Sequence, residues 1–262
     1  MISQALLDHA TKPSGLICIA GDRFSGVDQT LVSLTQSLQE SRVSEPKGNG
    51  HEKGIMILRG SPQTSQIESP FLIVQYSELI QPLVQKRVEE CHYLIFEKVK
   101  NFDELEWSLQ LAEEGHMVIV HVATNSICSL LHRLFSMWPS SQNLHYQWRF
   151  ADQLQLLINQ VYIRRAARGL FERGGNEGSE GSEFSIAYEM ALSTPLVKKH
   201  LVAGNLEAFE AELRKTEDKS GFLSLNQSLL QLLIRRKIDI SAAFQSTRDP
   251  EDLNNLLKKV GL

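Results

Sequence analysis

The chain has no long hydrophobic run and few cysteines. In its 262 residues no apolar stretch approaches the roughly 18 residues that a membrane-spanning helix needs. The N-terminal stretch MISQALLDHATKP lacks a basic start and a long apolar segment, so no signal peptide is expected. Cys18, Cys91 and Cys128 lie in or beside apolar runs without CxxC spacing, which predicts buried, reduced thiols in a cytoplasmic protein.

The charge balance has no basic excess. The formal net charge is -4, so no global positive field attracts the chain to nucleic acid. The histidines show neither HxxxH nor HxH ligand spacing, so no metal site is expected. With 42% hydrophobic and 22% charged residues, the composition is typical of a globular protein of one or two domains.

Short apolar runs alternate with helical patterns through the first half of the chain. Strands are expected over residues 16–20, 54–58, 71–74, 93–96 and 117–122. Helices are expected over about 28–41, 78–90, 103–114 and 128–137. This order predicts an α/β fold with a mainly parallel sheet and helical crossovers.

The pattern changes toward the C-terminus. We expect a core over residues 1–172, a flexible acidic Gly/Ser loop over 173–183, and a small all-helical domain over 184–262. Leu206, Phe209 and Leu213 form one apolar helical stripe, and Asp249 followed by Pro250 is typical of a helix start. The basic stretches IRRK and KKVGL are interpreted as solvated helix ends that complement the helix dipole.

One short stretch, GDRFSGVD at residues 21–28, has the setting of a phosphate-binding loop. An apolar strand pattern precedes it and a helical pattern follows it, as the motif GxxxxGK[ST] requires. Gly21 and Gly26 are in register with the two glycines. Val27 stands in place of the lysine, however, and Asp28 in place of the hydroxyl that binds Mg²⁺.

These replacements remove positive charge and add negative charge. Like charges about 4 Å apart repel by roughly 4 kcal/mol at an effective dielectric constant near 20, so Asp28 and Asp22 disfavour a bound phosphate. Two interpretations stay open. Either Mg²⁺ bridges Asp28 to a phosphate while Arg23 offsets some charge, or Asp28 caps the helix in the place a phosphate would fill.

Several segments, in their order along the chain, resemble the PilT-type pilus-retraction ATPases of the type II/IV secretion ATPase superfamily. The segments are ALLDHATKPSGLICIAG, YLIFEKV, ELEWSLQLAEEGHMVIVHVATNS, FADQLQLLINQVYIRR, FSIAYEMALSTPLVKKHLVAGNLEAFEAEL and LSLNQSLLQLLIRRKI. The resemblance runs from about Ala5 to the C-terminus. It implies a RecA-like (P-loop NTPase-type) core followed by helices, without the family's N-terminal PAS-like domain.

The resemblance also locates further nucleotide sites. Glu97 corresponds to the Walker B glutamate, but Val99 and Lys100 replace the Arg-Asp pair that follows it. Ala123 stands at the family's box histidine. Pro62 keeps the proline of the aspartate box, whose two acids are absent.

Loss at several separate sites predicts a pseudo-ATPase, because phosphoryl transfer depends on positioning and charge neutralisation. No catalytic residue is expected, with Glu97 the only candidate Walker B acid. Any residual nucleotide contact would come from the degenerate loop, and Asp28 would hold a metal only with bound Mg-ATP. The candidate contact residues are therefore Gly21, Arg23, Ser25, Gly26, Val27 and Asp28.

The resemblance implies an accessory or regulatory role in a bacterial type IV pilus (twitching motility) or a related secretion system. It implies protein partners, namely an active pilus ATPase or the inner-membrane platform, and a cytoplasmic location with peripheral attachment to that machinery. Two alternatives remain open: a weak nucleotide-binding protein or slow ATPase that uses Glu97, Asp28 and Arg23, and a protein-binding scaffold unrelated to pili. Among the histidines, His121 is expected to be a hydrogen-bonded core residue and His116 a surface or capping residue.

Overall fold

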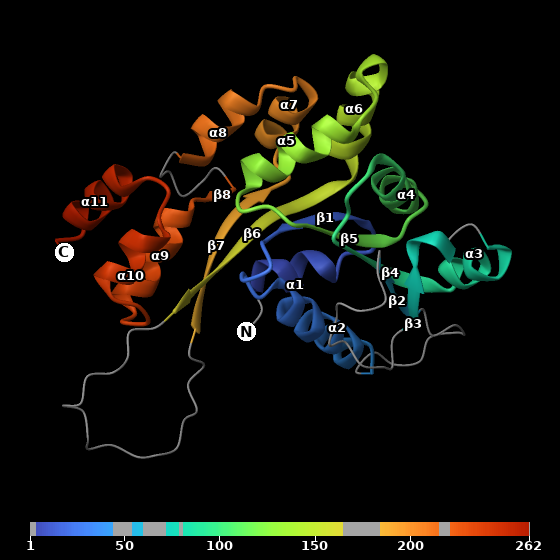
Figure 1. Cartoon of the computed structure of the whole chain (residues 1–262), viewed down its shortest axis with the longest axis horizontal. Helices are drawn as coiled ribbons and strands as arrows, with labels where there is room; N and C mark the ends of the chain where they lie inside the picture. The colour runs from blue at the N-terminus through green and yellow to red at the C-terminus, as the bar shows by residue number, and fades with distance from the viewer. Residues whose placement is uncertain are drawn as a thin grey trace.

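The computed structural model describes residues 4–43, 54–59, 72–78, 81–164, 184–214 and 221–261. Within these ranges the chain forms one mixed sheet in the order β3-β2-β4-β5-β1-β6-β7-β8 (Figure 1). The pairs from β3 to β6 are parallel, and β6, β7 and β8 pair antiparallel. The strands are β1 Gly15–Ala20, β2 Gly54–Arg59, β3 Leu72–Gln75, β4 Cys91–Glu97, β5 Met117–Val122, β6 Leu154–Arg164, β7 Phe184–Leu192 and β8 Phe222–Leu223.

Helices cover both faces of this sheet (Figure 1). One face carries α1 Gln4–Ala10 and α2 Val27–Val43. The other face carries α3 Pro82–Glu89, α4 Phe102–Glu113, α5 Ile127–Met137, α6 Asn143–Gln153, α7 Pro195–Val202 and α8 Leu206–Arg214. The short 3-10 helices are η1 Tyr76–Glu78 and η2 Ser140–Gln142.

The central strands are buried on both sides, which explains their continuous apolar sequences. Every residue of β1 and of β5 is buried. Successive side chains of a strand point to opposite faces, so Cys18 joins the core under α4–α8, whereas Ile17 and Ile19 join the core under α1 and α2. Burying one such side chain contributes about 1.5–3 kcal/mol.

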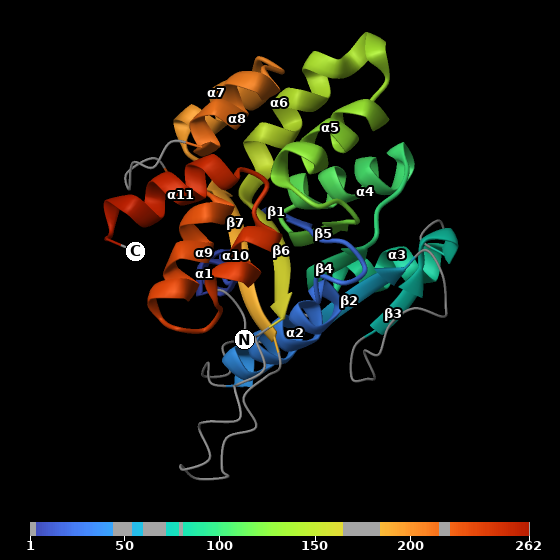
Figure 2. The ribbon, with the colours of Figure 1, turned by 60° about the vertical axis from the view of Figure 1, so that its left-hand side comes forward.

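The last three helices, α9 Leu225–Ile234, α10 Ile240–Ser246 and α11 Pro250–Lys259, form a third core. They pack on the part of β6 and β7 that extends beyond the other strands (Figure 2). Ile163 and Ala187 contribute from the strands, and Leu229 and Leu253 contribute from the helices. The sheet therefore supports the C-terminal helices directly.

Most of the expected elements are confirmed, with shifts of a few residues at their ends. The expectation that the chain is helical from residue 184 onward was wrong, because residues 184–192 form β7. In this strand Ser185, Ala187, Glu189 and Ala191 are buried and alternate with more exposed residues, which is the period of a strand. Helix α3 is also shorter than expected, because residues 76–78 form η1 and the helix begins at Pro82.

Some expectations concern parts of the chain outside the described residues. The acidic loop 173–183 and the stretch around Pro62 belong to this group. No disulfide joins the three cysteines; Cys18 and Cys91 are buried, as expected, and Cys128 is half-buried. None of the helices in the described part of the chain combines the length and the apolar character needed to cross a bilayer.

Candidate functional site

The carboxyl ends of the parallel strands bring three loops to one edge of the sheet. These loops follow β1 at residues 21–26, β4 at 98–101 and β5 at 123–126. Ligands of open α/β sheets bind at this edge. Strand β6 runs on past the end of β1, since Ala20 pairs with Asn159 and β6 continues to Arg164. The loop after β1 is thus flanked by β6.

The loop at residues 21–26 is tied together by its own polar groups. The Phe24 N–H donates to the Asp22 carboxylate at 2.8 Å. The Ser25 N–H and hydroxyl both donate to the Asp22 carbonyl, at 3.2 and 2.7 Å. The Gln160 amide donates to the Ser25 carbonyl at 2.8 Å and accepts from the Thr30 hydroxyl at 2.7 Å. Two amides of the loop therefore bond within the loop.

Val27 fills the position of the phosphate-binding lysine with a core side chain. It is 1% exposed and lies in the core with Ile17 and Ile19. A Cβ built on Gly21 would lie 2.3 Å from a Val27 methyl carbon and 2.4 Å from the Ser25 hydroxyl oxygen. The side chains of Val27 and Ser25 thus fold closely over the first glycine of the loop.

Asp28 is paired with a cation from the neighbouring strand end. Helix α2 begins at Val27, so Asp28 lies in the first turn and is not the N-cap that the sequence suggested. The Lys98 ammonium lies 3.7 Å from the Asp28 carboxylate, with the two side chains 32% and 42% exposed. Lys98 has φ 56°, in the left-handed region. Sequence reasoning missed Lys98 because no local pattern predicts that backbone conformation.

Tyr162 closes the loop from the side of β6. Gly26 has φ 73°, and a Cβ there would lie 1.9 Å from the Tyr162 ring. The Tyr162 ring stacks on Phe184, with ring centroids 5.5 Å apart. Burial raises the pKa of Tyr162. Beside the loop is a cavity of about 190 Å³ whose lining includes Asp22, Phe24, Asn125, Tyr162, Ser246 and Arg248.

The structure also places the predicted residues Glu97, Arg23 and Ala123. Glu97 is 5% exposed at the end of β4, and its carbonyl accepts a 2.9 Å hydrogen bond from the Tyr76 hydroxyl. Arg23 lies over the ring of Phe24, 4.9 Å from its centroid, and that ring is 73% exposed. Ala123 is exposed and cannot act as the family's histidine does.

The prediction for His121 is confirmed, whereas His116 is half-buried and not at the surface. His121 is 2% exposed, and its Nε2 lies 3.1 Å from the Gly21 carbonyl, to which it donates. Burial lowers the pKa of His121, so the ring is neutral. His116 lies in the turn before β5 and donates from Nδ1 to the Cys91 carbonyl at 2.8 Å. Within the described ranges no group of three or more His, Cys, Asp or Glu side chains could hold a metal.

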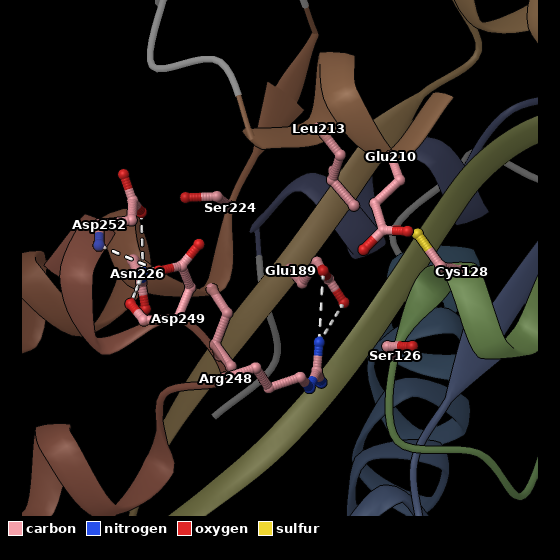
Figure 3. A pocket seen from close by; sticks show the side chains of 11 residues that line it. Ser126, Cys128, Glu189, Glu210, Leu213, Ser224, Asn226, Arg248, Asp249 and Asp252 are labelled. Atoms are coloured by element: carbon pink, nitrogen blue, oxygen red, sulfur yellow. Dashed lines mark hydrogen bonds and ion pairs between the residues drawn. The ribbon is translucent and has the colours of Figure 1, made fainter. Parts of the chain in front are cut away.

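A second cavity, of about 120 Å³, lies where the C-terminal helices meet the sheet (Figure 3). The Glu189 carboxylate, on β7, accepts from the Ile127 N–H at 3.1 Å and from the Arg248 guanidinium at 3.3 and 3.4 Å. Arg248 also donates to the Asn125 carbonyl. One buried carboxylate therefore joins β7, the start of α5 and the segment before α11.

The segment that carries Arg248 is itself fixed. The Asn226 amide donates to the Asp249 carbonyl at 2.9 Å and accepts from the Thr247 hydroxyl. The sequence offered one signal for this site, which is a glutamate at an inward position of the alternating pattern in FSIAYEMAL. That signal was missed because the stretch was interpreted as helical.

Known proteins are similar to this chain in sequence and in fold. No protein-family model matches the chain. The chain is 20% identical over 246 residues to the type IV pilus retraction ATPase PilT of Pseudomonas aeruginosa, a match that covers 92% of this chain and 64% of that protein. This similarity supports the resemblance to the type II/IV secretion ATPases that the sequence suggested.

Solved structures of a pilus retraction motor and of two further ATPases share the fold. The crystal structure of the pilus retraction motor PilT with bound ADP gives a TM-score of 0.70 at 17% identity, over 97% of this chain and 67% of that chain. The ATPase DotB of Legionella pneumophila gives 0.66 at 13% identity, over 93% and 62%. DotB of Yersinia pseudotuberculosis gives 0.63 at 16% identity, over 93% and 60%. These likenesses confirm the predicted RecA-like fold.

The strand, turn and helix of a phosphate loop are thus present in this chain, with different side chains. A buried valine, a carboxylate and a lysine from the neighbouring strand end occupy the positions around it. The Asp28 carboxylate is already paired with the Lys98 ammonium. Helix α2 carries Val27, and not a lysine, at the position that would contact a phosphate.

The contact between Gly26 and Tyr162 predicts a specific response to substitution. Gly26→Ala combines a strained positive φ, which costs on the order of 1–3 kcal/mol, with a clash against the ring. In urea unfolding, we expect Gly26→Ala to lose more unfolding free energy than Gly115→Ala. At Gly115 φ is 98° and no atom lies within 4 Å of the added carbon. In a Tyr162→Ala background, where the ring is absent, Gly26→Ala should cost about as much as Gly115→Ala. Equal losses for the two alanine variants would contradict the contact.

The neutral state of His121 predicts a pH dependence of stability. Because burial lowers its pKa from 6.5, the unfolded chain binds more protons below that pH, and stability falls as the pH drops. Between about pH 7.5 and about pH 5.5, the free energy of unfolding falls because of His121 by up to about 1.4 kcal/mol per pH unit. Urea unfolding of His121→Gln should show a smaller pH effect than wild type. His132→Gln, at an exposed histidine, should behave as wild type.

Proposed function

We propose that the chain is a pseudo-ATPase of the type II/IV secretion ATPase superfamily that acts as an accessory or regulatory interaction protein. The observation that carries the proposal is the state of the loop at residues 21–28. Val27 is 1% exposed in the core and Asp28 is paired with Lys98. In both positions the group that would contact a nucleotide is already engaged by the protein.

The Lys98–Asp28 pair explains how a carboxylate is tolerated at this place. In the phosphate loop this position carries the hydroxyl that binds Mg²⁺. Here the partner is an ammonium group from the end of β4, so the protein supplies its own cation. An exposed pair of this kind contributes little to stability, about 0–1 kcal/mol. It nevertheless means that Mg²⁺ would have to compete with Lys98 for the carboxylate.

The hydrogen bonds of the loop support the same proposal. Phosphate binding by such loops depends on backbone N–H groups that point at the anion. The N–H groups of Phe24 and Ser25 donate to Asp22 instead. Tyr162 lies against Gly26 on the opposite flank. Binding a nucleotide would require these contacts to open together.

The slow-ATPase alternative requires Arg23 to replace the missing lysine and Asp28 to hold Mg²⁺. Arg23 lies over the exposed Phe24 ring at the tip of the turn, and Asp28 is already paired. Removing one charge-stabilising group from a catalytic site often costs a factor on the order of 10²–10³ in rate. The contacts therefore favour the pseudo-ATPase.

The proposed setting is a bacterial type IV pilus or a related secretion system, with an active ATPase of the superfamily as the partner. The support is the relationship to PilT and the fold shared with PilT and DotB. The chain spans 64% of the length of the PilT sequence that it matches, so activity and assembly are proposed for it and not carried over. The proposed location is the cytoplasm, with peripheral attachment through protein partners.

Calorimetry with ATP and ADP, with and without Mg²⁺, tests the loop. We expect no binding tighter than about millimolar, which corresponds to about -4 kcal/mol. PilT of Pseudomonas aeruginosa serves as the positive control. Micromolar binding that Asp28→Ala abolishes would contradict the proposal and would support a nucleotide sensor or a slow ATPase.

Affinity capture of the tagged chain from its native host, followed by mass spectrometry, tests the setting. We expect a superfamily ATPase or another pilus or secretion component to be enriched over the tag alone. Capture should persist in Asp28→Ala, since the proposed role does not need nucleotide. Recovery of no such component would remove the pilus or secretion setting and leave the unrelated scaffold as the explanation.

A further inference from the structure

The turn between α9 and α10 exposes cations and aliphatic side chains together. Arg235, Arg236 and Lys237 are all exposed. They are flanked by Ile234, the last residue of α9, and Ile240, the first residue of α10, which are 57% and 55% exposed. We call these five residues the basic corner.

Arg236 occupies a backbone position that usually belongs to glycine. Helix α9 ends in a Schellman motif, with the Arg236 N–H bonded to the Leu233 carbonyl and the Lys237 N–H to the Leu232 carbonyl, both at 2.9 Å. Arg236 therefore has φ 52°, a left-handed conformation that is strained for a residue with a Cβ. A side chain retained against such strain is a reason to look for a function.

The cations of the basic corner are not paired with a carboxylate in the part of the chain that the structure describes. No ion pair or side-chain hydrogen bond is formed by Arg235, Arg236 or Lys237 within those ranges. Asp239 is exposed nearby, but its carboxylate accepts from the Ala242 N–H and caps α10. The corner is thus positive on a chain whose net charge is -4.

Compensation of the helix dipole explains only part of this arrangement. A cation near the last turn of a helix is favourable, and the end of α9 gains from one. The dipole does not require three consecutive cations, and it gives no reason for two isoleucines to face water beside them. Phe244, one turn after Ile240 and 36% exposed, extends the apolar surface along α10.

We propose that the basic corner docks on the headgroup surface of an anionic lipid bilayer. Cations attract acidic headgroups, and aliphatic side chains that project beside them enter the boundary between headgroups and acyl chains. The five residues of the corner are exposed, and the cavities beside the loop and at Glu189 are lined by other residues. An exposed turn that joins cations and aliphatic side chains suits a deformable lipid surface, which offers acidic headgroups next to acyl chains.

The second basic segment of the C-terminal helices has the same character. Lys258, Lys259 and Val260 are exposed at the end of α11, and Val260 is 48% exposed. Leu257, which precedes them, shares its core with Leu233, which precedes the basic corner. These residues add positive charge to the same helical unit.

Vesicle co-sedimentation of the purified full chain tests the proposal. We expect binding to phosphatidylcholine vesicles that contain one third phosphatidylglycerol and none to pure phosphatidylcholine. Binding should weaken as ionic strength rises above about 0.1 M, where the Debye length is about 10 Å. One triple variant neutralises the corner: Arg235→Gln, Arg236→Gln, Lys237→Gln. Its partitioning onto anionic vesicles should be weaker by about 100-fold, since each cation near an anionic surface contributes roughly fivefold.

Two single variants distinguish docking from a structural role. Arg236→Gly should weaken partitioning about fivefold and raise Tm by about 1–3 °C, because glycine relieves the positive φ. Ile240→Ser should weaken partitioning while charge is unchanged. The control is the double variant Lys86→Gln, Arg87→Gln, which removes two exposed cations from the last turn of α3. It should bind anionic vesicles as wild type does.

Three outcomes would overturn the proposal. One is absence of wild-type binding to the anionic vesicles. Another is equal binding to neutral and anionic vesicles. The third is an equal loss of vesicle binding in the α3 variant and in the corner variant. That result would mean that binding depends on the overall charge of the chain and not on the corner. If an acidic protein requires the corner while anionic vesicles do not bind, the surface is a protein interface and lipid docking is wrong.

Discussion

The burial of Val27 is the constraint on which the site depends. Its side chain lies between β1 and α2, in the same core as Ile17 and Ile19, and so fixes how the helix leaves the loop. A lysine at this position would have to leave that core to reach a phosphate. Because an unpaired buried ammonium is costly, this buried position suits a valine better than a lysine. Asp22 accepts hydrogen bonds from Phe24 and Ser25 within the loop, and the Tyr162 ring lies against Gly26.

Two contacts link the loop and the start of α2 to the neighbouring strand ends. Asp28, close to the positive end of α2, pairs with Lys98 from β4, and His121 from β5 holds the Gly21 carbonyl. These contacts join three neighbouring strand ends to one another. On the other side of β6, Glu189 and Arg248 connect the C-terminal helices to the loop after β5. The parallel edge therefore acts as a junction between the sheet and the helices that extend from it.

Much of the fold could be predicted from sequence, because its signals are local. The apolar runs of β1 and β5, the Asn101 cap of α4 and the stripe of α8 each act over a few residues. Strand β7 was missed because its pattern of period two lies beside helical stretches. Its role depends on pairing with β6, whose residues are distant along the chain. In the candidate site, Gly21, Gly26 and Asp28 were found by motif, whereas Lys98 and Tyr162 were not.

The sequence by itself determined that a strand, a glycine turn and a helix occur in the order of a phosphate loop, and that its lysine and hydroxyl are absent. Spacing and residue type are sufficient for both conclusions. Only the tertiary structure decided what replaced the missing groups. A lysine 70 positions after Asp28 and a tyrosine 136 positions after Gly26 reach the loop because β4 and β6 belong to the same sheet (98 minus 28; 162 minus 26). Such contacts leave no local trace, since they arise from strand order and not from neighbouring residues.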